Sequence, residues 1–161
     1  MENPMTQPVF QAYAVSVCAL AITLFGLGAH TAKTRSERKI VVNSEDAGIN
    51  GGAALGDVDH PDVQRIKRAH MNLIESAVPF FAVGFLYCLT SPNVALARTL
   101  FAAFVLTRVF HAVFYLGAKQ PFRTIAFGVG TLVSLVMIVQ VLRALVSVSY
   151  THLTLPTSDL V

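Results

Sequence analysis

Polar side chains with helical spacing occur inside three apolar stretches of the sequence. Residues at i, i+4 and i+7, or at i, i+3 and i+7, share one face of an α-helix. An ionisable residue in hydrocarbon is costly, so such side chains must face protein, water or a ligand. The first set consists of Arg68, Asn72 and Glu75. The second and third sets consist of Arg108, His111 and Tyr115, and of Arg123 with Thr124.

The charge balance of these sets leaves two interpretations open. Glu75 and Arg108 could form an ion pair that holds the helices together without any ligand. Taken together, however, the sets contain more arginines than carboxylates, and unpaired charge near hydrocarbon is unfavourable. Because the arginine guanidinium suits carboxylates, we favour a small, polar, anionic ligand that comes from the cytosol.

The composition is typical of a membrane protein. Of the 161 residues, 54% are hydrophobic and only 13% are charged, whereas a soluble domain has about 25% charged residues. Cys18 and Cys88 occupy separate apolar segments without CxxC spacing. We interpret both as buried thiols rather than as a disulfide or a metal site. The first ten residues lack the features of a cleavable leader, so the apolar segment that follows is expected to be retained.

Four apolar segments are each long enough to cross a bilayer, which takes about 20 helical residues. We therefore predict an all-α membrane protein, a four-helix bundle formed by a single domain from residue 1 to 146. The predicted helices cover residues 9–30, 61–90, 94–118 and 122–146. Asp59 is expected to cap the second helix. Residues 147–161 lack an amphipathic period, which predicts a non-native or disordered tail.

Basic residues predict the orientation of this bundle. They concentrate in the polar segment 31–60, at the start of the second helix, and in the turn between the third and fourth helices. By the positive-inside rule, the loop 31–60 is cytoplasmic and both termini lie on the opposite side. All three polar sets then lie near the cytoplasmic ends of their helices. These basic residues are Lys33, Arg35, Arg38, Lys39, Arg65, Lys67, Arg68, Lys119 and Arg123.

Two long strings of the sequence, VQRIKRAHMNLIESAVPF and TRVFHAVFYLGAKQPFRT, closely resemble the MAPEG family, the membrane-associated proteins in eicosanoid and glutathione metabolism. The upstream string NSEDAGINGG is similar to the microsomal prostaglandin E synthase branch of that family. The resemblance covers residues 33–145. It implies a four-helix protomer, a homotrimer, and glutathione bound between neighbouring protomers near the cytoplasmic face.

The resemblance also implies a role for individual residues. The arginines would take the carboxylates of glutathione, and Glu75 would take its ammonium group or brace an arginine. Because a cation beside a thiol lowers its pKa, Arg123 is expected to produce the thiolate, with a hydrogen bond from Thr124. Asp46 matches an aspartate proposed to help proton transfer. The implied glutathione contacts are Arg35, Arg68, Asn72, Glu75, Arg108, His111, Tyr115, Arg123 and Thr124.

Three departures from the prostaglandin E synthase branch remove polar groups. Met71 stands in place of an arginine, Phe127 in place of a tyrosine and Thr131 in place of a glutamine. We therefore expect a broader glutathione transferase or peroxidase, rather than an isomerase for prostaglandins alone. Its second substrate would be a lipophilic electrophile or peroxide from the bilayer. The host membrane would be a bacterial inner membrane or the endoplasmic reticulum.

The alternative is a non-catalytic lipid-binding or scaffold protein built on the same bundle. Such a protein would not need the arginine and tyrosine set. A channel or transporter is disfavoured because the spans lack the repeated broken-helix pattern of transporters. The histidines lack the spacing of metal ligands and the basic residues flank the apolar segments, so neither a metal nor a nucleic-acid partner is expected.

Overall fold

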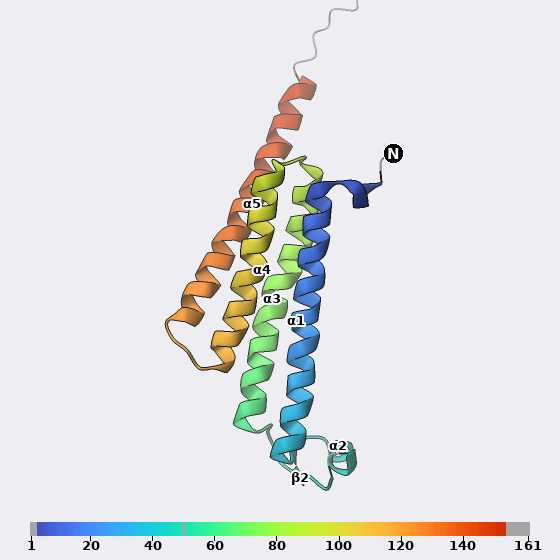
Figure 1. Ribbon diagram of the computed structural model, residues 1–161, viewed down its shortest axis with the longest axis vertical. Coiled ribbons are helices and arrows are strands. Elements are labelled where there is room, and N and C mark those ends of the chain that lie inside the picture. Colours follow the sequence, from blue (N-terminus) through green and yellow to red (C-terminus); the bar gives the residue numbers. More distant parts are fainter. Residues whose placement is uncertain (1–2, 50, 154–161) are drawn as a thin grey trace, which may run out of the picture.

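The computed structural model describes residues 3–49 and 51–153. A short 3-10 helix, η1 (Pro4–Thr6), precedes the first long helix. Each long helix contains a stretch that is long and apolar enough to cross a membrane. Within the described residues the protein is thus an all-α membrane protein with four spans, as predicted (Figure 1). The four long helices are α1 (Pro8–Arg38), α3 (Pro61–Leu89), α4 (Val94–Leu116) and α5 (Phe122–Leu153).

The helices run alternately up and down, and α3 and α4 form the centre of the bundle (Figure 1). Helix α1 packs on α3 and α4, and α5 packs on the same two helices. In the described part of the chain, α1 and α5 do not pack against each other. They lie on opposite sides of the central pair. A site that uses both α1 and α5 therefore cannot form compactly within one chain.

Two of the long helices begin at residues with clear capping chemistry. Asn93 caps α4, because its Oδ1 accepts a hydrogen bond from the Leu96 amide at 3.1 Å. At α3, the N-cap is His60, whose Nδ1 accepts from the Asp62 amide at 3.2 Å, and Pro61 follows in the first turn, where its missing N–H costs nothing. The prediction that Asp59 caps α3 is therefore wrong. The Asp59 carboxylate is buried and forms ion pairs with two basic side chains instead.

The segment between α1 and α3 is more ordered than a simple loop. Helix α1 continues two turns beyond its predicted end at residue 30 and stops at Arg38, where Lys39 adopts a left-handed conformation. Next come β1 (Ile40–Val41), α2 (Ser44–Ile49) and β2 (Ala54–Leu55), and the two strands pair in parallel. Helix α5 continues to Leu153, past the predicted boundary at 146. Residues 154–161 of the predicted tail lie outside the described residues.

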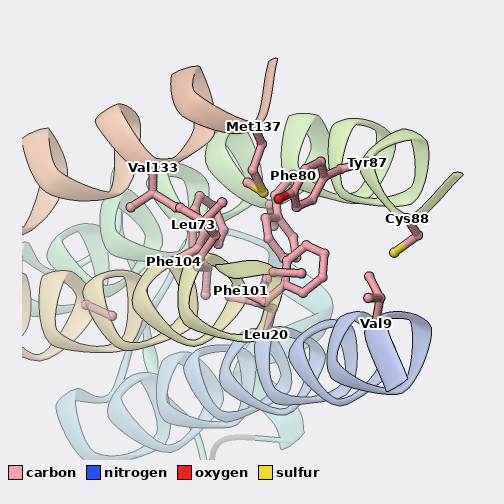
Figure 2. Packing of buried hydrophobic residues seen from close by; sticks show 14 of the residues in the cluster. Val9, Leu20, Leu73, Phe80, Tyr87, Cys88, Phe101, Phe104, Val133 and Met137 are labelled. Carbon is pink, nitrogen blue, oxygen red and sulfur yellow. The ribbon is translucent and has the colours of Figure 1, made fainter. Parts of the chain in front are cut away.

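Aromatic side chains fill the centre of the bundle (Figure 2). The rings of Phe80 on α3 and Phe104 on α4 stack with centroids 4.2 Å apart and an interplanar angle of 5°. Offset stacking of this kind adds to the stability gained from area burial, and it fixes how α3 and α4 face α5. Cys88 is buried as predicted, but Cys18 is exposed on α1, which corrects that prediction.

Candidate functional site

Arg108 is the most deeply buried charged side chain among the described residues, with 2% of its surface exposed. Its Nη2 donates hydrogen bonds to two α5 carbonyls, those of Phe127 at 2.8 Å and Ala126 at 3.4 Å. Its Cζ lies 5.4 Å from the centroid of the Phe104 ring and 5.3 Å from that of Phe127. Carbonyl oxygens and aromatic faces both stabilise a cation. None of them carries a formal negative charge.

Gly130 makes the position of Arg108 sterically possible. A Cβ atom built on Gly130 would overlap the Arg108 guanidinium. The guanidinium therefore lies directly against the backbone of α5, where it reaches the carbonyls of the preceding turn. An alanine at this position would push the charged group away from α5. This role of Gly130 could not be predicted from the sequence, because nothing in a single glycine shows which side chain approaches it.

A cavity of about 290 Å³ adjoins Arg108 where α3, α4 and α5 meet. Its walls are largely apolar, and Glu75 stands at its exposed edge. Pro79 also lines it, and since proline has no N–H, the carbonyl of Glu75 one turn earlier loses its helical partner. The lining residues are Asn72, Glu75, Ser76, Pro79, Phe104, Arg108, Phe127, Gly130, Thr131, Ser134, Leu135 and Ile138.

The ion pair between Glu75 and Arg108, one of the two interpretations of the sequence, is not formed. Within residues 3–49 and 51–153, Glu75 has neither a salt bridge nor a side-chain hydrogen bond. Arg108 points to α5 rather than to α3, and its Nε is buried with no hydrogen-bond partner. A buried donor without a partner is costly. The Arg108 charge beside the cavity thus has no carboxylate partner in the described part of the chain.

A second cavity, of about 310 Å³, lies toward the α4–α5 turn. It shares Asn72 and Phe127 with the first, so the two cavities adjoin. The Arg123 Cζ lies 4.6 Å from the centroid of the Tyr115 ring. The His111 ring meets Tyr115 edge to face at 5.8 Å between centroids. The lining residues are Asn72, His111, Tyr115, Arg123, Thr124 and Phe127.

Gln120 is a residue of this second cavity region that the sequence did not reveal. With its amide oriented to satisfy both neighbours, its oxygen accepts from Arg123 Nη2 at 2.7 Å and Nε at 3.2 Å. Its amide nitrogen then donates to the Thr124 hydroxyl at 3.0 Å. Gln120 thus orients both predicted catalytic side chains of α5. Its place three and four residues before them, at the start of a helix, was the available signal.

Three of the predicted site residues lie away from both cavities. Arg68 is exposed on α3 one turn before Asn72, and its backbone carbonyl accepts from Asn72 Nδ2 at 2.8 Å. Arg35 lies at the end of α1, and Asp46 lies on α2, where it accepts from Asn43 Nδ2 at 3.3 Å. Figure 1 shows α2 and the end of α1 projecting beyond the α4–α5 turn. One chain therefore gathers Asn72, Glu75 and the predicted residues of α4 and α5, but not Arg35, Arg68 or Asp46.

At the end of α1, Arg35 is paired with the buried carboxylate of Asp59. Arg35 Nε and Nη2 donate to its two oxygens at 3.0 and 3.1 Å, and Lys67 Nζ donates at 2.9 Å. The hydrogen bond from Arg35 holds the pKa of Asp59 below its ordinary value, and Lys67 adds to this effect while burial opposes it. This cluster joins α1 to the start of α3.

The positions that depart from the prostaglandin E synthase branch have different surroundings. Met71 is exposed on α3, with 55% of its surface accessible. Phe127 lines both cavities and covers Arg108. The Thr131 hydroxyl donates to the Phe127 carbonyl at 3.0 Å, which is one of the carbonyls that hold Arg108. At Phe127, the wall of the second cavity thus has a phenyl ring without the hydroxyl group of the tyrosine in that branch.

Four apolar spans, three of which meet at a polar site, define an integral, multi-pass membrane protein. The MAPEG family model matches residues 13–143. The chain belongs to the MAPEG family, as its two long strings predicted. It is 34% identical to the prostaglandin E synthase of Homo sapiens over 139 residues, which cover 86% of this chain and 91% of the relative. It is 35% identical to the microsomal glutathione S-transferase 1 of Rattus norvegicus over 148 residues, 89% of this chain and 96% of the relative.

Proposed function

We propose that this protein is a membrane glutathione transferase or peroxidase that acts on lipophilic electrophiles or peroxides from the bilayer. The observation that supports it best is Arg108, a buried cation beside a cavity and without a carboxylate partner in the described part of the chain. Burying an unpaired charge is costly, and an anionic ligand offsets this cost. The names of the relatives, glutathione S-transferase and prostaglandin E synthase, indicate the class of ligand.

The two cationic positions are far enough apart to contact different groups of one glutathione molecule, a carboxylate at Arg108 and the thiol at Arg123. Arg108 and Tyr115 are seven residues apart on α4, which is roughly 10 Å along the helix axis. Arg123 lies over Tyr115, so the second guanidinium stands about that far from the first. An extended tripeptide spans a similar length, roughly 10 Å. Glu75, at the edge of the first cavity, is placed to accept hydrogen bonds from the ammonium group.

The chemistry is assigned to the second cavity. When bound, glutathione would supply a thiolate that displaces a leaving group from an electrophilic carbon. With a peroxide, the thiolate would attack one oxygen and release the alcohol, and a second glutathione would convert the resulting sulfenic acid to the disulfide and water. A free thiol with a pKa of about 8.5 is mostly protonated at neutral pH, and a neighbouring cation lowers that pKa. Arg123 supplies the cation, held by the Gln120 oxygen and the Tyr115 face. The Thr124 hydroxyl is placed to donate a hydrogen bond to the sulfur.

Arg35 and Asp46 take part in this site only if a neighbouring copy presents them. They stand at the α1 end of the molecule, and α1 does not pack on α5 within the described chain. A homotrimer, which the family resemblance implies, would bring the α1 end of one protomer to the cavities of the next. Glutathione would then lie between protomers near the cytoplasmic face, and Asp46 would assist proton transfer from the adjacent chain.

Purified protein in detergent tests this proposal. Glutathione is expected to bind and to raise the unfolding temperature, and the bound thiol is expected to show thiolate absorbance at neutral pH. Turnover is then measured with a chlorodinitrobenzene-type electrophile, a lipid hydroperoxide and an endoperoxide. Conjugation or peroxide reduction is expected to exceed endoperoxide isomerisation, because the cavity wall carries Phe127 and Thr131. A folded protein that binds no glutathione would favour the scaffold alternative.

A further inference from the structure

At the α1 end of the molecule, a buried carboxylate accepts two hydrogen bonds from one edge of an arginine side chain. Asp59 is 6% exposed and accepts from Arg35 Nε at 3.0 Å and from Nη2 at 3.1 Å. Two parallel hydrogen bonds fix both the position and the plane of the guanidinium. The Asp59 backbone is held as well, because its carbonyl accepts from Gln64 Nε2 at 2.7 Å. Because both the carboxylate and the backbone of Asp59 are held, the Arg35 guanidinium has a fixed orientation.

The other edge of the same guanidinium stays available. A guanidinium has five N–H donors, and the hydrogen bonds to Asp59 use only the Nε–Nη2 edge. Among the residues that the structure describes, no hydrogen bond is made by Arg35 Nη1. The Arg35 side chain is 28% exposed. Its Nη1–Nη2 edge can thus take a second carboxylate in the same two-bond manner.

The positive charge of Arg35 is not cancelled by its partner. Asp59 also accepts from Lys67 Nζ at 2.9 Å, so two cations share one buried carboxylate. Asp46 acts on Arg35 from a longer range and partly offsets the surplus. A neighbouring pair, Arg38 with Asp62, is internally balanced. The cluster of Arg35, Asp59 and Lys67 thus keeps one excess positive charge, which favours an anion.

We propose that Asp59 is a positioning residue that presents the free edge of Arg35 to a carboxylate of glutathione in a neighbouring copy of the chain. The inference rests on the proposed function. Arg35 cannot reach the cavities of its own chain, since α1 and α5 lie on opposite sides of the bundle. Fixing a side chain with many rotamers before binding removes an entropy cost equivalent to roughly twofold to tenfold in affinity.

The test is a double-mutant cycle on glutathione affinity, measured by titration calorimetry with the purified, detergent-solubilised oligomer. Asp59→Asn is expected to weaken binding by roughly twofold to tenfold, as the loss of pre-orientation requires. Arg35→Ala is expected to weaken it at least as much. The double variant is expected to equal Arg35→Ala, because Asp59 acts only through Arg35. If the losses of glutathione affinity in the two single variants add up in the double variant, the proposal is overturned. An unchanged affinity of Asp59→Asn would also overturn it.

Two further variants separate positioning from folding. Asp62→Asn breaks the exposed pair with Arg38, which also joins α1 to α3, and is expected to leave glutathione affinity unchanged. Arg35→Lys keeps an ion pair with the buried carboxylate but cannot form the two-bond fork. Arg35→Lys is expected to bind glutathione as weakly as Arg35→Ala. Wild-type affinity of Arg35→Lys would overturn the role of Asp59, even if Asp59→Asn fails to fold. Absence of binding by the wild type would instead count against the proposed function itself.

Discussion

Two arginines of this molecule are stabilised in opposite ways. Arg35, at the end of α1, donates two hydrogen bonds to the buried Asp59 carboxylate, which Lys67 also contacts. Arg108, in the middle of α4, is 2% exposed and has no carboxylate partner in the described chain. Its guanidinium donates hydrogen bonds to α5 carbonyls and lies over two aromatic rings.

The contrast separates a cation that has a carboxylate counter-ion within its own chain from one that has none among the described residues. A buried carboxylate with two cationic partners satisfies its own charge, so the Asp59 cluster ties α1 to α3 without outside help. Carbonyl dipoles and ring faces stabilise a buried cation less completely than a counter-ion does. Burial of the Arg108 charge therefore costs free energy, and under the proposed function an anionic ligand would offset that cost. A buried charge at such a position favours a role in binding over a role in folding.

The largest effect is expected at the catalytic end of the cavities. Arg123→Ala removes the cation beside the thiol, so turnover should fall about 10²- to 10³-fold, the usual loss for one electrostatic contact to a reacting centre. Thiolate absorbance of bound glutathione should fall in parallel, because the pKa of the thiol rises. Arg143→Ala, on an exposed part of the same helix, is the matched control and should retain both. Unchanged thiolate absorbance in Arg123→Ala would assign the activation to another group.

The contrast itself is tested by removing the charge of Arg108. Arg108→Met should weaken glutathione binding by roughly 10- to 100-fold, the equivalent of a hydrogen bond between charged groups. The ligand-free protein should remain as stable or become more so, because replacing a buried charge by an apolar side chain is often neutral or stabilising. Arg98→Met, on an exposed position of α4, serves as control. Unfolding temperatures with and without glutathione measure both effects, and a large loss of ligand-free stability would contradict the comparison.

A smaller effect is expected when the Arg108 guanidinium is displaced but kept. Gly130→Ala places a Cβ where the guanidinium lies, so glutathione affinity should fall about threefold to tenfold, the equivalent of roughly 1 kcal/mol. Gly128→Ala is a matched control two residues away, since a Cβ there has nothing within 4 Å. Both substitutions gain helix propensity. Equal affinities of the two variants would show that the Arg108 position does not matter for binding.

The smallest expected effect is the loss, at acidic pH, of the folding stability that the Asp59 cluster contributes. The pKa of Asp59 lies below its ordinary value of 3.8 because Arg35 and Lys67 favour the carboxylate. The folded state therefore binds a proton less readily than the unfolded state, and stability from this pair is complete above about pH 4 and is lost at lower pH. The difference in unfolding temperature between wild type and Asp59→Asn should stay constant from neutral pH to about pH 5 and shrink toward pH 3. A difference that grows in acid would contradict this assignment.

Much of the arrangement follows from local sequence. Apolar segments of about 20 residues must be helical in a bilayer, because every backbone polar group needs an internal partner there. The spacing of Asn72 and Glu75, and of His111 and Tyr115, placed each pair on one helix face. The exact starts of helices were less accessible. The sequence indicated Asp59, a preferred type of N-cap residue. Only the structure shows that its carboxylate pairs with Arg35 and Lys67 and that His60 caps the helix.

The sequence by itself determined the four spans, the family and the polar side chains that meet at the cavities. These depend on periodicity and on long strings that a single chain displays. Only the tertiary structure decided the partners of the charges. Arg108 turns to the α5 carbonyls rather than to Glu75 because Gly130 leaves room against the backbone, and Arg35 turns to Asp59. Such pairings depend on the rotation and separation of packed helices, to which the stacked rings of Phe80 and Phe104 contribute.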